Sequence, residues 1–166
     1  MSPSRYASWV IVNPACVSFT TPVWISSRVL NADWYRRDAV VTSARLALDQ
    51  SHHRLFDGVR DPAKLIVLDT ESGKQVSQVE GVSGIDDLWY DASHKRVYAS
   101  GGRGFEVGSV YVYQQKDPDH YELIGKVPTA PGAGTSFWSP QLNRLYVAAP
   151  SNDKEEAAIL VFEPQP

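Results

Sequence analysis

Short apolar runs recur along this chain after residue 45, and each is bounded by polar residues rich in Asp, Ser, Gly and His. Runs of this length without helical periodicity are typical of β-strands. The pattern therefore predicts an all-β structure in which strand follows strand and no long helix intervenes. The expected strands are 40–41, 46–48, 54–56, 64–69, 75–79, 85–90, 96–100, 109–114, 121–127, 135–138, 144–148 and 158–162.

One nine-residue pattern occurs three times, at 48–56, 90–98 and 138–146. Its arginine recurs as Arg54, Arg96 and Arg144, which are 42 and 48 residues apart. A period of roughly 40 to 50 residues with several short strands in each unit is typical of β-propeller blades. The repeat predicts about three blades within 46–166, the third of which stops before a fourth strand.

The repeated segments resemble the YVTN and WD40-like propeller families over about residues 46–163. The likeness rests on the hairpin Asp-x-x-x-x-Arg followed by Leu or Val and an aromatic residue, and on the turn from Val67 to Lys74. No Trp-Asp dipeptide ends a unit, so the chain departs from the strict WD40 pattern. The resemblance implies a fold built from propeller blades.

Three blades are too few for one ring, because closed propellers have about four to eight. An open array leaves the backbone of its edge strands exposed. Residues 1–45 cover the open side, or two chains assemble through open blade edges into a homo-oligomer, or the chain is a fragment of a longer reading frame. The predicted fold class is therefore all-β, with propeller-type blades that are incomplete as a single closed ring.

Residues 1–45 differ in composition from the rest of the chain. They carry five arginines, no lysine, two aspartates and no glutamate, for a net charge of +3, whereas residues 46–166 carry a net −6. They also hold three of the five tryptophans and no copy of the repeat. This break predicts a boundary near residue 45. The first segment would be a covering strand pair or a foreign extension that the blades do not need in order to fold.

Charge and composition narrow the range of partners and locations. A net charge of −3 over 166 residues offers no electrostatic footprint for nucleic acid. No apolar run approaches the roughly 20 residues of a membrane span. Cys16 is the only cysteine, which excludes an intramolecular disulfide. The N-terminus is a poor signal peptide, so a cytoplasmic location is favoured, while a periplasmic or secreted one stays open.

Asp86 and Asp87 break the repeat at the start of the expected inner strand of the middle blade, where residues 44–45 and 134–135 are the matching positions. Adjacent carboxylates at a strand end suit Ca²⁺, which prefers oxygen ligands. Alternation along a strand sends the two side chains to opposite faces unless the backbone bulges. The sequence thus predicts a calcium site at Asp86 and Asp87, with a solvated carboxylate pair as the alternative.

Other polar residues of the repeat fit turns better than chemistry. Asp49 and Asp91 share one repeat position and are expected to close an Asx-type turn. His53, His94 and Asn143 are assigned to one turn position that tolerates a left-handed backbone. His52 and His120 have no expected repeat partner. No Gly-x-Ser-x-Gly nucleophile motif or phosphate loop is present.

Two functions follow from these observations. The first is a non-catalytic binding or scaffold module that presents a blade surface or channel mouth to a partner. The second is a Ca²⁺-dependent hydrolase of lactone-type small molecules, because the families resembled include lactone-hydrolysing enzymes, some of which hold Ca²⁺ on the channel axis. In that alternative, Asp86 or Asp87 binds the ion, which polarises the carbonyl. Asp91 or His120 then acts as the base.

Overall fold

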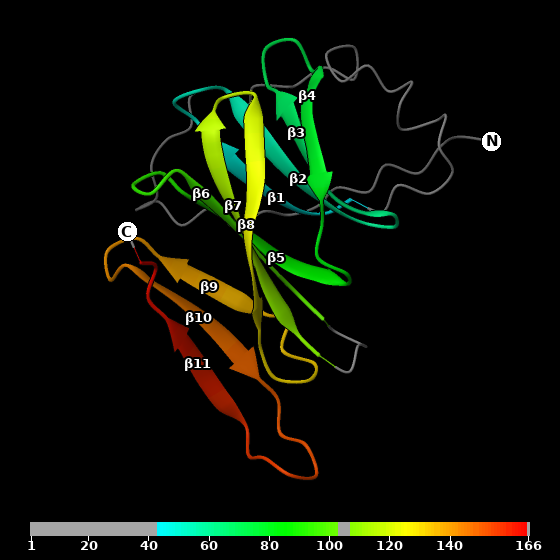
Figure 1. The fold of residues 1–166 in the computed structure, drawn as a ribbon, viewed down its shortest axis with the longest axis vertical. Helices are drawn as coiled ribbons and strands as arrows, with labels where there is room; N and C mark the ends of the chain where they lie inside the picture. The colour runs from blue at the N-terminus through cyan, green and yellow to red at the C-terminus, as the bar shows by residue number, and fades with distance from the viewer. Residues whose placement is uncertain (1–42, 103–106, 166) are drawn as a thin grey trace, which may run out of the picture.

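The computed structural model describes residues 43–102 and 107–165, and these residues form eleven strands and no helix (Figure 1). The predicted strand at 40–41 and the role of residues 1–42 lie outside this part. The other expected strands are confirmed. They are β1 (Ser43–Asp49), β2 (Arg54–Arg60), β3 (Ala63–Asp69), β4 (Gln75–Glu80), β5 (Ile85–Asp91), β6 (Arg96–Gly101), β7 (Ser109–Asp117), β8 (His120–Pro128), β9 (Ser136–Ser139), β10 (Arg144–Ala149) and β11 (Ala158–Phe162).

The strands form three antiparallel sheets in which consecutive strands are neighbours. Sheet 1 has the order β1-β2-β3-β4, sheet 2 the order β5-β6-β7-β8, and sheet 3 has only β9-β10-β11. The first strands lie side by side, since β5 packs against both β1 and β9. The fold is thus an array of three blades that does not close, which confirms the predicted fold class.

A tight turn joins the first two strands of every sheet, and the residue before each repeat arginine has a left-handed backbone. The φ angles are 56° at His53, 53° at Lys95 and 52° at Asn143. The sequence-based alignment of His94 with His53 and Asn143 is therefore wrong by one residue. His94 is instead the equivalent of His52, because both come two residues before the repeat arginine.

Two apolar clusters hold the sheets together. Between sheets 1 and 2, Phe56, Val97 and Tyr113 are fully buried, and the Phe56 ring meets the Tyr121 ring edge-on with 5.4 Å between centroids. Between sheets 2 and 3, the cluster centres on Trp138 and includes Tyr98, Leu145 and Val147. Each fully buried side chain of this size contributes about 1.5–3 kcal/mol. Because sheet 2 lies between the other two sheets, it supplies one face to each cluster.

No helix in the described residues is long and apolar enough to cross a membrane.

Candidate functional site

Asp86 and Asp87 lie at the start of β5, where the pairing with β6 shifts register between Ile85 and Asp87. Such a bulge lets neighbouring side chains turn to the same side. The Arg45 guanidinium accordingly reaches both carboxylates, with Nη2 3.6 Å from Oδ1 of Asp86 and Nε 3.3 Å from Oδ1 of Asp87. The two acids thus share a cation supplied by β1.

The remaining carboxylate oxygens also have partners. The Thr135 hydroxyl donates to Oδ2 of Asp86 at 2.9 Å, and the backbone N–H of Ser136 donates to Oδ2 of Asp87 at 2.7 Å. Arg60 adds a second guanidinium, 3.8 Å from Asp86. Within 43–102 and 107–165, no three His, Cys, Asp or Glu side chains group as metal ligands would. Through these contacts, Asp86 and Asp87 link the inner strands of all three sheets. The calcium site assigned to these two residues stays a prediction.

Asp91 is a buried turn-closing residue at the opposite end of β5, only 1 % exposed. Its Oδ1 accepts the backbone N–H of Ser93 at 3.0 Å and the Ser93 hydroxyl at 2.6 Å. Its Oδ2 accepts the Tyr98 hydroxyl at 3.0 Å and lies 2.6 Å from Nδ1 of His94. Burial alone would raise the pKa of Asp91, but these hydrogen bonds outweigh burial and hold that pKa below its ordinary value. This is the Asx-type turn that the repeat predicts.

Asp49 closes the equivalent turn of sheet 1. Its carboxylate accepts from the Ser51 N–H at 3.1 Å and the Ser51 hydroxyl at 2.6 Å, and lies 2.7 Å from Nδ1 of His52. Burial again opposes ionisation, and the hydrogen bonds from Ser51, Gln115 and His52 again lower the pKa of Asp49. The Asp–Ser–His arrangement is therefore a repeated structural element. In the sequence, this element could have been recognised from His52 and His94, which occupy the same repeat position. The alignment shifted by one residue placed His94 with His53 instead.

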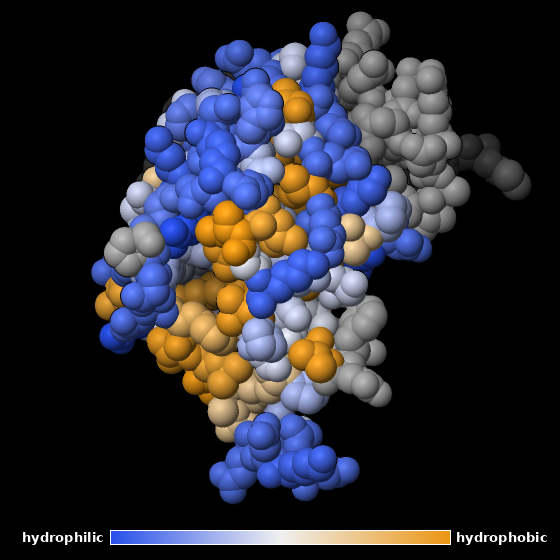
Figure 2. All heavy atoms as spheres, viewed as in Figure 1, coloured by the Kyte–Doolittle hydropathy of each residue, from blue (hydrophilic) through white to orange (hydrophobic). Residues whose placement is uncertain are grey.

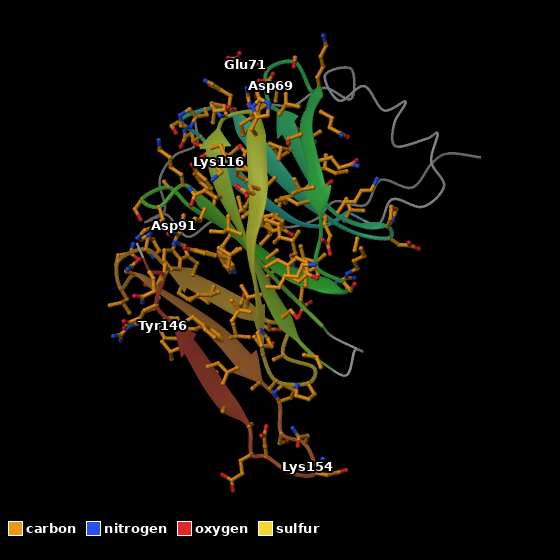
Figure 3. The ribbon with its side chains drawn as sticks, viewed as in Figure 1. Asp69, Glu71, Asp91, Lys116, Tyr146 and Lys154 are labelled. Carbon is orange, nitrogen blue, oxygen red and sulfur yellow. The ribbon has the colours of Figure 1, made fainter. Side chains whose placement is uncertain are left out.

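The structure does not gather the residues assigned to the hydrolase. Asp86 and Asp91 are five positions apart on one strand, which corresponds to roughly 16 Å at about 3.3 Å per residue. His120 is the first residue of β8, at the Asp91 end of sheet 2, and is exposed, with Nδ1 2.8 Å from Oδ1 of Asp117 at the end of β7. Figure 3 shows Asp91 close to the end of sheet 2 that faces sheet 3. The catalytic assignment of Asp91 and His120 stays a prediction.

Sheet 3 presents a face with several exposed apolar side chains, of which Phe137 also meets Trp89 of β5 edge-on, with 5.6 Å between ring centroids. Phe137, Tyr146 and Val161 form one row across β9, β10 and β11, and Ile159 lies beside it. Phe137 is 56 % exposed, Ile159 62 % and Val161 50 %. We call these four residues the outward face of sheet 3. Figure 2 shows apolar atoms gathered over sheet 3 and alongside β8.

The outward face of sheet 1, at the other end of the array, is different. There Val59, Ile66 and Leu68 form a separate cluster on the side turned away from sheet 2, and each is 5 % exposed or less. Leu46 and Leu48 of β1 lie on the same side and are 59 % and 51 % exposed. The two ends of the array are therefore not equivalent. On sheet 1 the exposed apolar residues of this face belong to β1, whereas on sheet 3 both outer strands expose them, with Tyr146 half-buried between Phe137 and Val161.

A groove of about 200 Å³ lies between sheet 2 and sheet 3. Its walls are almost entirely apolar, and residues of β7, β8, β10 and β11 supply them. They are Val110, Val112, Val127, Leu145 and Phe162, with Arg96, Tyr98, Glu163, Pro164 and Gln165 completing the lining. Sequence reasoning missed this groove, because it depends on how sheets 2 and 3 are placed relative to each other in space.

Comparison with known proteins adds to the picture of the fold. Neither protein-family models nor curated protein sequences match this chain. Its structure is similar to a chain in the crystal structure of the mitotic checkpoint complex, with a TM-score of 0.58, 15 % identity, and coverage of 72 % of this chain and 36 % of that chain. It is also similar to hydrazine synthase of Kuenenia stuttgartiensis, with a TM-score of 0.57, 10 % identity, and coverage of 72 % and 33 %.

The chain thus spans about one third of the length of these two proteins. At such low identity the likeness concerns the fold and no activity. Together with the three open sheets, it assigns this chain to the all-β, propeller-like architectures as an incomplete propeller.

Proposed function

We propose that this chain is a non-catalytic binding module that associates through the outward face of sheet 3. The observation that carries the proposal is the apolar row of Phe137, Tyr146 and Val161 with Ile159 beside it, in which Tyr146 is half-buried and the other three side chains are exposed. Contiguous exposed apolar surface of this kind marks interaction sites on soluble proteins. The inner faces of the same array bury their apolar residues against a neighbouring sheet, and a partner would do the same for this face.

A second copy of the chain is the partner that fits this face. A head-to-tail contact would need the outward face of sheet 1, where Leu46 and Leu48 are exposed but Val59, Ile66 and Leu68 are already buried, so that less of its apolar surface is available. A two-fold contact between two copies of the sheet 3 face needs no other surface, because the same patch serves both subunits. The row itself contains no charged residue, and Arg144 and Glu163, which flank it on the same face, form an ion pair with each other.

The hydrolase alternative rests on the sequence alone. Its proposed base Asp91 is 1 % exposed and fully engaged in a turn, which gives a substrate no access to its carboxylate. No observation on the described residues favours that alternative over binding.

The mass of the full chain in solution tests the proposal. We expect a dimer of the 18.4 kDa chain at micromolar concentrations by analytical ultracentrifugation. Replacing Ile159 and Val161 together by Lys should shift the chain to monomer, because two charges would enter each half of the interface.

Leu142→Lys is the matched control. Leu142 is 60 % exposed and belongs to the same sheet, but it lies in the β9–β10 turn outside the outward face. This variant should remain dimeric. A wild-type chain that is monomeric across the micromolar range would overturn self-association through this face.

A further inference from the structure

The two inter-sheet contacts of the array are built differently at their outer edges. Between sheets 1 and 2, the fourth strands β4 and β8 pack on each other, with Val76 and Val79 from one and Tyr121 and Leu123 from the other. Between sheets 2 and 3, β8 offers Val127, but the described part of sheet 3 ends at β11. The apolar groove lies where a strand next to β11 would pack.

The shape of the groove suits side chains of a strand. Pockets for drug-sized molecules have volumes of roughly 300–1,000 Å³ and enclose most of the ligand. This groove measures about 200 Å³ and is open along β11. Val112, Val127 and Phe162 supply apolar walls. The polar residues of the lining are Arg96, Glu163 and Gln165, and Nη1 of Arg96 is already engaged, donating to the Gln165 carbonyl oxygen at 2.6 Å. One or two apolar side chains that enter side by side would fill it.

The backbone of β11 provides the second half of the site. Among the described residues, β11 pairs only with β10, so the N–H and C=O groups on its other side have no strand partner. Unpaired edges of this kind accept an added strand. On β11, Leu160 and Phe162 face the groove while Ile159 and Val161 face outward. A strand added to this edge would therefore direct every second side chain into the groove.

We propose that the β11 edge and the groove bind an extended segment of another protein by antiparallel strand addition. The direction follows from the repeat, since the fourth strand runs antiparallel to the third in both sheet 1 and sheet 2. The site lies on the other face of sheet 3 from Phe137 and Val161. It therefore goes beyond the proposed self-association and does not require it.

The charges at the two ends of β11 determine which charges the bound segment should carry at its own ends. Glu155 and Glu156 precede β11 on an exposed hairpin, and no ion pair among the described residues involves them. At the other end of β11, Glu163 is neutralised by Arg144, with 2.6 Å between Oε1 and Nη2. The C-terminal end of an antiparallel segment lies near Glu155 and Glu156. The preferred partner is thus a segment with apolar residues at alternate positions and Lys or Arg at its C-terminal end.

The same charges disfavour β11 of a second copy as the occupant. Antiparallel pairing of two β11 strands would bring Glu155 and Glu156 of one chain next to Glu163 of the other, where the one nearby cation, Arg144, is already paired with Glu163 and leaves the two added carboxylates uncompensated. Figure 3 shows Lys154 at the tip of this hairpin, beyond the end of the sheet, so it does not lie along the edge. A partner with its own basic residues avoids this repulsion.

A labelled synthetic peptide tests the proposal on the full chain by fluorescence polarisation. The peptide alternates Thr with Val or Leu over eight residues and ends in two lysines, and its scrambled version has the same composition without alternation. Two further versions carry N-methyl groups on one or the other set of alternate amides. We expect binding of the parent, roughly tenfold weaker binding of one methylated version only, and weak binding of the scrambled one.

Protein variants locate the site. Val112→Lys should abolish binding by placing a charge in the groove, and Glu155→Lys with Glu156→Lys should shift preference roughly threefold toward a peptide that ends in two glutamates. The charge-reversed hairpin is exposed, so its fold can be verified by an unchanged Tm. Ile159→Lys with Val161→Lys serves as the control, because it disrupts the outward face and should leave peptide binding intact.

Three outcomes would overturn strand addition: equal binding of both methylated peptides and the parent, equal binding of the scrambled peptide, or no binding of the parent at millimolar concentration. Loss of the dimer with retained peptide binding would reject only the proposed self-association, so the two proposals fail separately.

Discussion

Tyr98 and Gln115 donate hydrogen bonds to carboxylates at equivalent positions in neighbouring sheets, Asp91 in sheet 2 and Asp49 in sheet 1. In sheet 2, the Tyr98 hydroxyl donates to Oδ2 of Asp91 at 3.0 Å. The corresponding residue of sheet 1 is Phe56, which has no hydroxyl, and there Nε2 of Gln115 donates to Oδ2 of Asp49 at 3.1 Å. Gln115 comes from β7 and is itself held by the Tyr90 hydroxyl at 2.7 Å. A residue of the second blade thus completes a turn of the first.

The first prediction concerns the repeat position that is Tyr98 in sheet 2 and Phe56 in sheet 1. Gln115→Ala should lower the free energy of unfolding by about 1–3 kcal/mol, because it removes one of the two hydrogen-bond partners of Oδ2 in the buried Asp49 carboxylate and leaves only His52 there. Adding Phe56→Tyr to that variant should recover about 1 kcal/mol, since the new hydroxyl takes the position that Tyr98 has in sheet 2. Urea denaturation of the single and double variants measures both changes. If Phe56→Tyr destabilises the chain equally with and without Gln115, the two positions are not equivalent.

The second prediction concerns the pH dependence of stability. The pKa of Asp91 is lower in the folded chain than its ordinary value of 3.8. Its ionised form therefore stabilises the fold fully above about pH 4, and this contribution disappears as the pH falls through the lower, folded pKa. Asp91→Asn should be less stable than the wild type by about 1–3 kcal/mol at pH 7, and the difference should shrink below pH 4.

Urea midpoints at pH 7, 4 and 3 provide the measurement. Asp117→Asn is the control, because the pKa of Asp117 is also lowered, by hydrogen bonds from the Asp119 backbone and His120, but this turn is exposed. That variant should change stability little at any pH. A constant difference between Asp91→Asn and wild type from pH 7 to 3 would show that the ionised carboxylate does not carry the stabilisation.

The third prediction concerns the junction of the three inner strands. Replacing Asp86 and Asp87 together by Ala should cost about 2 kcal/mol or more, because the Thr135 hydroxyl and the Ser136 N–H lose their acceptors. Thermal melting in chelator measures this loss without any metal.

The same experiment checks the calcium prediction. Bound Ca²⁺ would raise the Tm by mass action, and the double change to Ala would remove the rise. Equal melting of the wild type in Ca²⁺ and in chelator would contradict a calcium site and leave the ion pairs with Arg45 and Arg60 as the role of the two acids.

The sequence predicted the strands well, because each blade repeats local signals: an apolar run, a turn aspartate and an arginine. The turn roles of Asp49 and Asp91 followed from the same repetition. The sequence could not show which cations meet Asp86 and Asp87, because Arg45 and Arg60 approach from another sheet. It also could not show the groove lined by Val112, which depends on how two sheets diverge beyond their third strands.

The shared position of sheet 2 has a consequence for how the chain opens. Sheet 2 supplies Tyr113 to one apolar cluster and Tyr98 to the other, so its loss would dismantle both. Sheet 3 contacts only one neighbour among the described residues and has one strand fewer. It is therefore the unit that can detach with the least loss of buried surface, and local opening should start there. Both proposed surfaces thus belong to the part of the array with the greatest freedom to adjust its position when a partner arrives.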